Sequence, residues 1–329
     1  TMKKAELIEA MVAEDEKAQP ASEDAKNIDE KKKETTEEKN ETRQHRYPRQ
    51  QNGQYHENRK NDGRDHNLQN EVDMSLDSGI TTEGILEVMP DGYGFIRCEN
   101  YLPGDGDVYV SPTQIRRFNL KTGDIVCGNT RIKTQGEKFS ALLYVRSVNG
   151  YHPSEAQKRT GFENLTPIFP NERIRLEYGR GVNMAMRIVD LVSPIGKGQR
   201  GMIVSPPKAG KTTLLKAVAK SIVHSNPNMH VIILLIDERP EEVTDIKEAI
   251  RGENVEVIYS TFDELPEHHK RVSEMVVERA KRLVEHHQDV TILLDSITRL
   301  ARAYNLVVPP SGRTLSGGLD PAALHMPKR

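Results

Sequence analysis

The stretch Gly201–Leu215 constrains the fold of this chain more than any other feature of the sequence. It consists of a short apolar run, a turn that contains glycine and two prolines, and the start of an amphipathic segment. Gly210 lets backbone N–H groups approach a phosphate chain without an obstructing side chain. Lys211 adds a positive charge, and Thr212 offers a hydroxyl oxygen to magnesium. The pattern predicts a strand, a phosphate-binding loop and a helix, in that order.

The segment after the loop has the period of an amphipathic helix. Leu214, Val218 and Ile222 repeat at four-residue spacing and form one apolar face. The N-terminus of such a helix directs partial positive charge at bound phosphates. Ser205 occupies the position where this loop pattern usually opens with glycine or alanine, and serine is small enough to turn there. The alternative is an accidental Gly-Lys-Thr sequence on a surface helix, which the flanking strand and helix patterns disfavour.

Two later apolar runs indicate the rest of a sheet. Residues 231–236 are apolar throughout and residues 290–294 are apolar except for Thr291, which is typical of strands buried on both faces of a parallel sheet. Helices are expected around residues 243–250 and 272–284, where apolar residues recur at helical spacing. Ligands of such sheets bind beyond the carboxyl ends of the strands. The sequence therefore predicts a mostly parallel α/β domain with its site at that edge.

Acidic residues follow both apolar runs, where phosphoryl transfer from a nucleotide needs a metal partner and a positioned water. Asp295 is predicted to hold magnesium together with Thr212, and Glu238 to orient the attacking water. Arg239 and Lys208 are additional cations within reach of the phosphates. Two alternatives stay open at this point: Asp295 as the N-cap of a following helix, and Glu238 as a solvated loop carboxylate.

The region from about residue 84 to residue 150 has a different sequence pattern. Short alternating segments are separated by turns such as Pro90-Asp91-Gly92 and Thr122-Gly123-Asp124, without a long helical pattern. Regular short strands with turns of this kind are typical of a small β-barrel. We therefore expect a barrel in front of the nucleotide-binding domain.

One strand of the expected barrel carries a pattern suited to nucleic acid. Alternation places Tyr93, Phe95 and Arg97 on one face, where two rings and a guanidinium form a stacking platform for single-stranded bases. Stacking of this kind contributes roughly 1–3 kcal/mol per base. The alternative is that the rings are core, but Ile96 and Leu86 offer a different apolar face. Further candidates for completing a groove are Tyr109, Arg116, Arg117, Glu137 and Phe139.

The bulk properties set the class of protein. The 329 residues have room for about two domains. A net charge of −2 gives no general attraction to nucleic acid, so any such contact must be local. Cys98 and Cys127 lack metal-ligand spacing, indicate a reducing compartment and are expected to be ordinary sheet residues. No apolar run approaches a membrane span and the N-terminus lacks a signal-peptide core, so a cytoplasmic location without a membrane partner is expected.

The N-terminal part of the chain differs from the rest in composition. Residues 3–13 carry a short apolar helical face, which fits either the last helix of a small domain or a frayed terminal helix. Residues 14–78 contain few apolar residues and are predicted to be a disordered insertion rich in Asn, Arg and charged residues. The part from Arg43 to Arg64 mixes arginine with tyrosine and is compatible with loose RNA contact, although a solvated linker is the more common explanation.

Seven segments together resemble the family of bacterial transcription termination factor Rho. The resemblance extends from about residue 79 to residue 329 and rests on these motifs: Asp91–Arg97, Val108–Pro112, Gln114–Leu120, Ser193–Gly201, Pro206–Thr212, Asp237–Val243 and Leu294–Arg299. It implies an OB or cold-shock-like β-barrel in front of a RecA-like P-loop ATPase domain. The implied divisions are a remnant of an N-terminal helical domain (1–13), the insertion (14–78), the RNA-binding barrel (79–152), a connector (153–180) and the ATPase domain (181–329).

The resemblance also implies a function. The family acts as a homohexameric, RNA-dependent ATPase and 5′-to-3′ RNA–DNA helicase that uses ATP and Mg²⁺. It pulls on nascent single-stranded RNA and releases the transcript from the RNA polymerase elongation complex. Two alternatives stay open. Another ring ATPase, such as a rotary ATP synthase subunit, would hydrolyse ATP without RNA, and an RNA-binding module with an inert nucleotide fold would not need Lys211.

The family's functional residues are carried over where this sequence matches its motifs. The primary RNA site, which prefers pyrimidines, is expected at Gly92, Tyr93, Gly94, Phe95, Ile96, Arg97, Asp107, Val108, Tyr109, Glu137, Lys138 and Phe139. A pore loop with the secondary RNA site is expected at Thr314, Leu315, Ser316, Gly317 and Gly318, although a flexible surface loop has the same composition. Nucleotide contacts are expected from Gly196, Lys197, Gly198, Gln199, Arg200, Gly201, Lys208, Ala209, Gly210, Lys211, Thr212, Thr213 and Arg239. The implied catalytic residues are Glu238, Lys211 and Asp295, with Thr212 and Asp295 at the metal.

The sequence departs from the family pattern in two respects. Ser205 and Thr213 stand where some members carry alanine and a bulkier apolar residue, which leaves the adenine contacts open. The sequence stops at Arg329, where the family continues into a second RNA loop and an arginine finger. Because loss of such a cation reduces turnover by on the order of 10³–10⁵ in comparable systems, we expect these 329 residues alone to bind RNA but to hydrolyse ATP poorly.

Overall fold

The computed structural model describes residues 74–178 and 183–328. The chain divides into two compact units, residues 1–67 and 68–329, and every described residue belongs to the second unit. The predicted N-terminal helix and most of the predicted insertion therefore lie outside the described residues. The last five residues assigned to the insertion are described, and they form η1 (Met74–Leu76) and the first two residues of β1.

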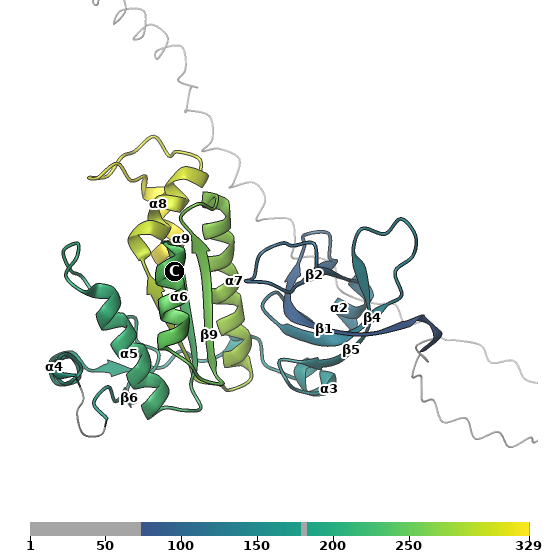
Figure 1. Ribbon diagram of the computed structural model, residues 1–329, viewed down its shortest axis with the longest axis horizontal. Helices are drawn as coiled ribbons and strands as arrows, with labels where there is room; N and C mark the ends of the chain where they lie inside the picture. Colours follow the sequence, from purple (N-terminus) through teal and green to yellow (C-terminus); the bar gives the residue numbers. More distant parts are fainter. Residues whose placement is uncertain (1–73, 179–182, 329) are drawn as a thin grey trace, which may run out of the picture. The chain divides into compact units, whose positions relative to one another are not determined.

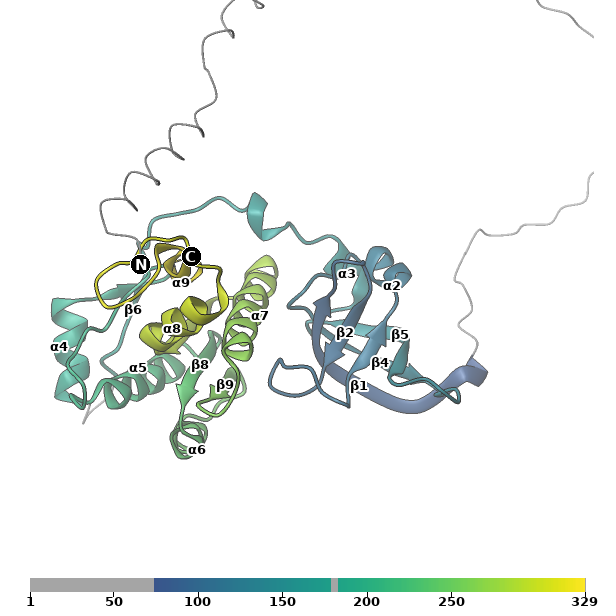
Figure 2. The same ribbon diagram turned by 90° about the horizontal axis from the view of Figure 1, so that it is seen from above.

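Five strands close into a barrel (Figures 1 and 2). Their order around the barrel is β1-β2-β3-β5-β4, with β3 and β5 parallel and every other neighbouring pair antiparallel. The strands are β1 (Asp77–Val88), β2 (Gly94–Arg97), β3 (Val108–Val110), β4 (Ile125–Arg131) and β5 (Ser140–Val148). A short helix, α2 (Pro112–Arg117), begins with a capping box from Ser111 and separates β3 from β4. The predicted OB-like barrel is confirmed.

Alternation along β2 decides which side chains fill the barrel. Leu86 and Ile96 are fully buried in the barrel core, so the inward face predicted from the sequence is confirmed. Successive residues of a strand point to opposite faces, so Tyr93 and Phe95 lie on the outside, where both are half-buried. Cys127 lies in β4 as expected, whereas Cys98 directly follows β2 and is exposed rather than part of the sheet.

A connector with two short helical turns, α3 (Pro153–Gln157) and η2 (Phe162–Asn164), leads out of the barrel. Its Arg159 side chain is almost fully buried between two carboxylates. Nη2 lies 2.6 Å from Asp124 Oδ2 in the barrel, and Nε lies 2.9 Å from Glu285 Oε2 at the end of α7 (Pro266–Glu285). Removal of Arg159 would leave two buried carboxylates without their shared cation, so this ion pair fixes the path of the connector.

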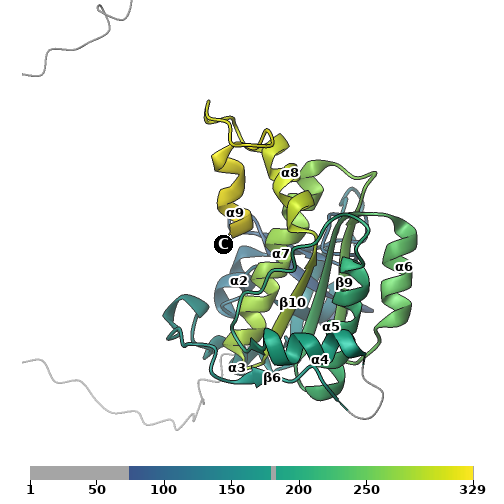
Figure 3. The ribbon, with the colours of Figure 1, turned by 90° about the vertical axis from the view of Figure 1, so that its left-hand side faces the viewer.

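The second domain is built on a three-stranded parallel sheet in the order β10-β8-β9 (Figure 3). The strands are β8 (His230–Glu238), β9 (Val255–Thr261) and β10 (Val290–Asp295). Its principal helices are α4 (Met184–Val192), α5 (Lys211–Ser225), α6 (Pro240–Ala249), α7 and α8 (Ile297–Val307). A small antiparallel pair, β6 (Arg173–Ile174) with β7 (Ile195–Gly196), and two short C-terminal turns, η3 (Pro321–Leu324) and α9 (His325–Lys328), complete the described elements. The α/β fold predicted from the apolar runs is confirmed.

Helices cover both faces of this sheet (Figure 3). Side chains of β8 alternate between two cores, because Ile232 and Ile236 pack with α7 and α8 while Ile233 and Leu235 pack with α5 and α6. This arrangement explains why the run 231–236 is apolar at every position. It also directs the carboxyl ends of β8 and β10 to one edge of the sheet, next to the N-terminus of α5.

The strand predicted before the phosphate-binding loop is absent from the described chain. Residues 201–206 form no ladder with a described strand, and Met202 and Val204 are 70% and 85% exposed. A strand is defined by hydrogen bonds to a neighbour, and apolar residues alone do not supply them. The prediction of a strand at this position is therefore wrong for this structure, whereas the loop and the helix that follow it are present.

One half-buried carboxylate at the contact of the two domains makes stability depend on pH. Glu256 accepts a hydrogen bond from Tyr101 of the barrel, and its Oε1 lies 2.6 Å from His230 Nε2. Burial alone would raise the pKa of Glu256, but the hydrogen bond from His230 and the charge of Arg279 lower it to about 2. A pKa below the unfolded value means that this stabilisation is present above about pH 4.5 and is lost as the pH falls toward 2.

We therefore expect Glu256→Gln to lower the free energy of unfolding at pH 7 by on the order of 3 kcal/mol. The difference from the unsubstituted protein should narrow as the pH is lowered through 4.5, because Glu256 then becomes protonated in the unfolded chain. Urea unfolding measured between pH 7 and pH 3 tests this expectation. A difference that stays constant over that range would show that the charge of Glu256 is not the source of the stabilisation.

Candidate nucleotide site and nucleic-acid-binding face

The phosphate-binding loop ends at the N-terminus of α5. Gly210 is the N-cap of this helix and has a φ of +84°, in the left-handed region that favours glycine. The free N–H groups of the first helical turn therefore face the space in front of the helix, where they can bind an anion. Lys208 also has a positive φ, of +62°, which makes the loop turn sharply before the helix.

Lys211 and Thr212 meet Asp295 at the carboxyl edge of the sheet. Lys211 Nζ lies 2.6 Å from Asp295 Oδ1, and Thr212 Oγ1 donates a 2.9 Å hydrogen bond to Asp295 Oδ2. Asp295 is 1% exposed, whereas the Lys211 side chain is partly exposed. The fold thus brings three of the predicted site residues together. Two of them, Thr212 and Asp295, are 83 positions apart in the chain. The N-cap position of α8, which had been the alternative role for Asp295, is occupied by Ser296, whose side chain makes no capping hydrogen bond.

Glu238 is the last residue of β8 and is buried beside the same edge. Arg299 Nη1 of α8 lies 3.4 Å from its Oε2. Burial raises the pKa of Glu238 to about 7, with further contributions from a hydrogen bond with Glu242 and from the charges of Glu242 and Asp295, while Arg299 opposes them. A carboxylate whose pKa lies near neutrality is suited to accept a proton from a bound water.

The outer face of the barrel carries a cluster of four aromatic rings, which we call the aromatic face: Tyr93, Phe95, Tyr109 and Phe139. Phe95 is its centre, with ring centroids 5.8 Å from Tyr93, 6.0 Å from Tyr109 and 5.1 Å from Phe139. Phe95 and Tyr109 are directly paired across β2 and β3, which explains why residues distant in sequence share the face. Half-exposed rings of this kind offer stacking surfaces to unpaired bases.

Arg97 does not lie open beside the rings as the sequence predicted. Its side chain is 5% exposed and forms ion pairs with Asp107 and with Glu87, at 2.7 Å from Nη2 to Glu87 Oε2. The guanidinium carbon lies 4.9 Å from the centroid of Phe95, so Arg97 supports the ring from within the barrel wall. Two acidic neighbours hold it there, and alternation alone gave no information about them.

Two stretches of the chain match described protein families. Residues 82–154 match "Rho termination factor, RNA-binding domain", and residues 185–316 match "ATP synthase alpha/beta family, nucleotide-binding domain". The chain is 56% identical to transcription termination factor Rho of Pseudomonas aeruginosa over 254 residues, which are 76% of this chain and 60% of that relative. It is 57% identical to Rho of Haemophilus influenzae over 250 residues, 75% of this chain and 59% of the relative. Over these residues, the chain is similar to transcription termination factor Rho.

These matches confirm the resemblance to Rho and the fold class, a Rho-type RNA-binding barrel followed by a P-loop nucleotide-binding domain. The chain spans about 60% of the length of these Rho relatives. Among solved structures, an ATPase of the type III secretion system of pathogenic bacteria is 21% identical, with a TM-score of 0.42, over 59% of this chain and 51% of its own. In the described ranges, no helix is long and apolar enough to cross a bilayer.

Of the other nucleotide-site residues expected from the resemblance to Rho, some lie near Glu238 and others lie far from the phosphate-binding loop. Arg239 is the N-cap residue of α6 and lines a cavity of about 570 Å³ together with Asp237, Phe262 and Arg299, close to Glu238. Lys197 lies elsewhere, because its Nζ is 2.5 Å from Glu172 and 2.7 Å from Asp289, the residue before β10. Six residues of strand, roughly 20 Å, separate that end of β10 from Asp295. The structure thus does not bring Gly196 and Lys197 to the phosphate-binding loop.

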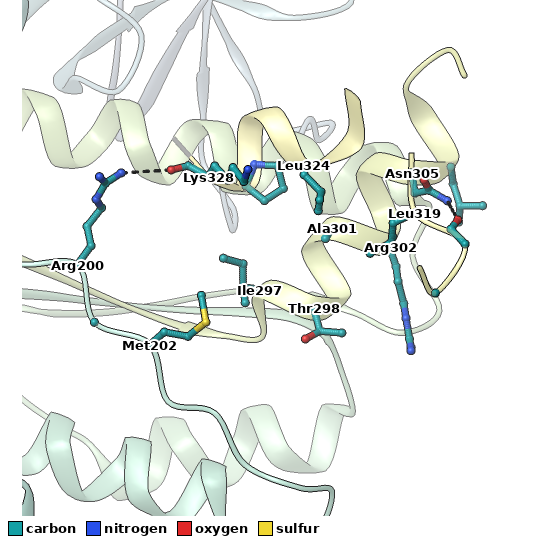
Figure 4. A pocket seen from close by; sticks show the side chains of 15 residues that line it. Arg200, Met202, Ile297, Thr298, Ala301, Arg302, Asn305, Leu319, Leu324 and Lys328 are labelled. Carbon is teal, nitrogen blue, oxygen red and sulfur yellow. Dashed lines mark hydrogen bonds between the residues drawn. The ribbon is translucent and has the colours of Figure 1, made fainter. Parts of the chain in front are cut away.

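The loop expected to be the secondary RNA site of the Rho family is exposed. Within Thr314–Gly318, Gly317 and Gly318 have positive φ values, and Gly318 N–H donates to Leu315 C=O. Both glycines line a cavity of about 1020 Å³ together with Met202 and Ala301 (Figure 4). Arg200 is placed at its far side, where Nη1 donates a 3.2 Å hydrogen bond to the Lys328 carbonyl (Figure 4). The RNA role of this loop stays a prediction.

The other predicted RNA-site residues of the barrel differ in whether their side chains already have partners within the protein. Glu137 is paired with Arg131, and backbone and side-chain hydrogen bonds with Thr134 are the main cause that lowers its pKa. Lys138 Nζ lies 5.1 Å from the centroid of Phe139 and remains exposed. Lys138 and the aromatic face are therefore the members of the predicted Rho-type RNA site that are open to a ligand.

Two residues of the nucleotide site were not singled out from the sequence. Arg299 pairs with Glu238, and Glu242 lies within hydrogen-bonding reach of it. The sequence offered a signal for each, because Arg299 follows Asp295 by four residues and Glu242 follows Glu238 by four. A four-residue offset at the start of a helix returns a side chain toward the end of the preceding strand.

Proposed function

We propose that this chain is the RNA-binding and nucleotide-binding part of an RNA-dependent ATPase that terminates transcription. It would bind nascent, pyrimidine-rich single-stranded RNA on the aromatic face and hydrolyse ATP at the edge of the β10-β8-β9 sheet. The observation that carries this proposal is the meeting of Lys211, Thr212, Asp295 and Glu238 at one edge of a sheet, in a chain that also holds a Rho-type barrel. The relatives that support it are named transcription termination factor Rho.

The geometry suggests how the chain would promote hydrolysis. The first turn of α5 and Lys211 would bind the phosphates, because N–H groups and an ammonium converge in front of Gly210. Glu238 would accept a proton from, and orient, the attacking water. Arg299 would hold the Glu238 carboxylate in place at 3.4 Å, and Arg239 would add positive charge at the neighbouring cavity.

The oxygen donors at this edge fit a magnesium ion. Thr212 Oγ1 and the Asp295 carboxylate are 2.9 Å apart, and both are hard oxygen ligands of the kind that Mg²⁺ prefers beside nucleotide phosphates. When bound, Mg²⁺ would neutralise charge on the phosphate oxygens. Thr212 and Asp295 would hold it, and Lys211, which now pairs with Asp295, would turn toward the phosphates.

The larger assembly is part of the proposal. We infer a homohexamer that acts as a 5′-to-3′ RNA–DNA helicase in the cytoplasm and displaces RNA from the polymerase elongation complex. Thr314–Gly318 would contact RNA in the central pore. These inferences rest on the Rho relatives, of which the chain spans about 60%.

The proposal is tested by ATP hydrolysis in protein produced from the full-length gene, with and without poly-pyrimidine RNA. We expect hydrolysis to depend on RNA, because the barrel and the nucleotide site belong to one compact unit. Equal rates with and without RNA would instead favour a second candidate, a ring ATPase of another kind. The match of residues 185–316 to the ATP synthase alpha/beta family is the observation that supports this second candidate.

Lys211→Ala separates an active nucleotide site from an inert nucleotide fold. Removal of a charge-assisted hydrogen bond to phosphate costs about 1.5–3 kcal/mol, so ATP affinity should fall roughly 10- to 100-fold. Isothermal titration with a non-hydrolysable ATP analogue measures this change, and Lys220→Ala, later in α5 on an exposed position, is the control. Termination that survives Lys211→Ala would mean that nucleotide turnover is not what drives release.

A further inference from the structure

A chain of four charged side chains connects the aromatic face to helix α7 of the nucleotide-binding domain. Arg97 pairs with Asp107 and with Glu87, and Glu87 uses its other oxygen to pair with Arg271 of α7. The Glu87 Oε1 accepts from Arg271 Nη2 at 2.6 Å and from Arg271 Nε at 3.0 Å. The Glu87 Oε2 accepts from Arg97 Nε at 2.8 Å. One carboxylate thus joins a guanidinium of the barrel to a guanidinium of α7.

Glu87 lies directly beside the central ring. It is the cross-strand partner of Phe95 in the β1–β2 pair, while Tyr109 is the partner of Phe95 on the other side. Arg97, two residues after Phe95, lies on the same face of β2 and places its guanidinium carbon 4.9 Å from the ring centroid. The position of Phe95 therefore depends on Arg97, and Arg97 is held by the two carboxylates.

The four charges balance only when Arg271 is included. Arg97 and Asp107 are 5% and 3% exposed, so water screens their charges little. Arg97 alone faces two carboxylates and leaves the barrel wall with one uncompensated negative charge. Arg271 supplies the second positive charge from outside the barrel. An uncompensated carboxylate beneath the rings would repel the phosphates of an approaching strand and would draw Arg97 out of its position.

The contact is fixed by its surroundings. Asn100 of the barrel accepts a 3.1 Å hydrogen bond from the Tyr259 N–H of β9, and Tyr101 packs in the same core as Val272 and Met275 of α7. In addition, Ser260 Oγ lies 2.7 Å from His269 Nδ1, which ties the first turn of α7 to the end of β9. Arg271 therefore reaches Glu87 from a helix that is packed against the barrel, and the ion pair is not a contact between two free side chains.

We propose that Arg271 and Glu87 are positioning residues of the RNA site: α7 holds Arg97 under Phe95 through the Glu87 carboxylate. Arg271 itself belongs to the nucleotide-binding domain and is not a member of the aromatic face. This inference rests on the proposed RNA-binding function of that face and deepens it. Its consequence is that a charge change on α7 alters the affinity for RNA without touching either the RNA or the phosphate-binding loop.

The test compares the affinity for a fluorescent oligocytidine among single and double variants of Arg271 and Glu87 in this 329-residue chain. Arg271→Met removes the charge and keeps an unbranched apolar stem, and we expect about tenfold weaker binding. The double variant Glu87→Gln with Arg271→Met removes one charge of each sign and should restore binding to within about threefold. Lys270→Met is the matched control, because the neighbouring Lys270 side chain has no ion pair or hydrogen bond within the described part of the chain. It should bind RNA as the unsubstituted chain does.

Each other outcome overturns the inference. Unchanged binding by Arg271→Met would show that Arg271 does not position the RNA site. The same loss of binding in the double variant would show that the effect does not pass through Glu87. An equal loss in Lys270→Met would indicate general attraction between RNA and positive charge. Phe95→Ala in the same series separates the two levels of the proposal. If Phe95→Ala binds oligocytidine normally, the aromatic face is not the RNA site and both proposals fail. If only Phe95→Ala weakens binding, RNA recognition stands and the role of Arg271 is refuted.

A second readout excludes a merely structural effect. In protein from the full-length gene, Arg271→Met should raise the RNA concentration for half-maximal ATP hydrolysis about tenfold and leave the maximal rate within about twofold. Arg271→Lys, which keeps the charge, should recover most of the RNA affinity and remains informative if Arg271→Met folds poorly. A lower maximal rate with an unchanged half-saturating RNA concentration would overturn the positioning role.

Discussion

Glu238→Gln should reduce the maximal rate of RNA-stimulated ATP hydrolysis by about 10²–10⁴-fold and leave ATP binding nearly unchanged. A general base contributes a rate factor of this size, and the amide of glutamine cannot accept the proton of the attacking water. Steady-state hydrolysis and a separate titration with a non-hydrolysable analogue distinguish turnover from binding. Hydrolysis at the unsubstituted rate by Glu238→Gln would assign water activation to another group.

The pH dependence of the rate provides an independent check on the same residue. Burial and Glu242 raise the pKa of Glu238 to about 7, and the base must be deprotonated to work. The rate should therefore rise as the pH increases through about 7. Glu242→Gln removes one of the charges that raise the pKa of Glu238, so this rise should move to lower pH in that variant. An unchanged profile in Glu242→Gln would contradict the coupling of the two carboxylates.

The double variant Tyr93→Ala with Phe95→Ala should weaken binding of pyrimidine-rich RNA between about 30-fold and 10⁴-fold. Each ring that loses a stacked base costs about 1–3 kcal/mol, so two rings cost about 2–6 kcal/mol. Phe95 also contacts Tyr109 and Phe139, so its removal disturbs the whole aromatic face. Filter binding with an oligocytidine, followed by titration with a nucleotide analogue, measures both affinities.

Nucleotide affinity should stay within about twofold in the Tyr93→Ala and Phe95→Ala double variant, because neither ring belongs to the described edge that carries Lys211 and Asp295. Phe169→Ala is the matched control, since Phe169 is an exposed ring in the connector, outside the barrel. RNA binding by the double variant at the level of this control would rule out the aromatic face as the site.

The sequence pattern was sufficient to predict where Lys211 lies, but not that Arg97 is buried. The role of Lys211 follows from a local pattern, because a loop, a glycine and a helix N-terminus are contiguous in the chain. Asp295 was predicted to join this loop because both lie at strand or helix ends of one parallel sheet, and the 2.6 Å contact agrees with that expectation. Arg97 was predicted to be open because alternation gives only the face on which a side chain lies. It is buried because Glu87 and Asp107 happen to converge on it.

The strand predicted before the loop failed for a related reason. Met202 and Val204 have the composition of a buried strand, yet they are exposed in this structure. Composition reports that a segment can be buried, whereas strand formation requires a neighbour with free N–H and C=O groups in register. The pairing partner is a property of the whole fold, and no window of sequence contains it.

The sequence by itself determined the elements whose cause is local. These are the apolar strands β8 and β10, the helix that begins at Lys211, the barrel with Leu86 and Ile96 inside, and the carboxylates at the strand ends. Only the tertiary structure decided which charges meet. Burial raises the pKa of Glu238 to about 7, Glu242 and Asp295 add to the rise, and Arg299 opposes it. The link from Phe95 to α7 runs through Glu87 and Arg271, which are 184 positions apart in the chain. Electrostatic effects depend on distance in space and on burial, and the chain fixes both only after it has folded.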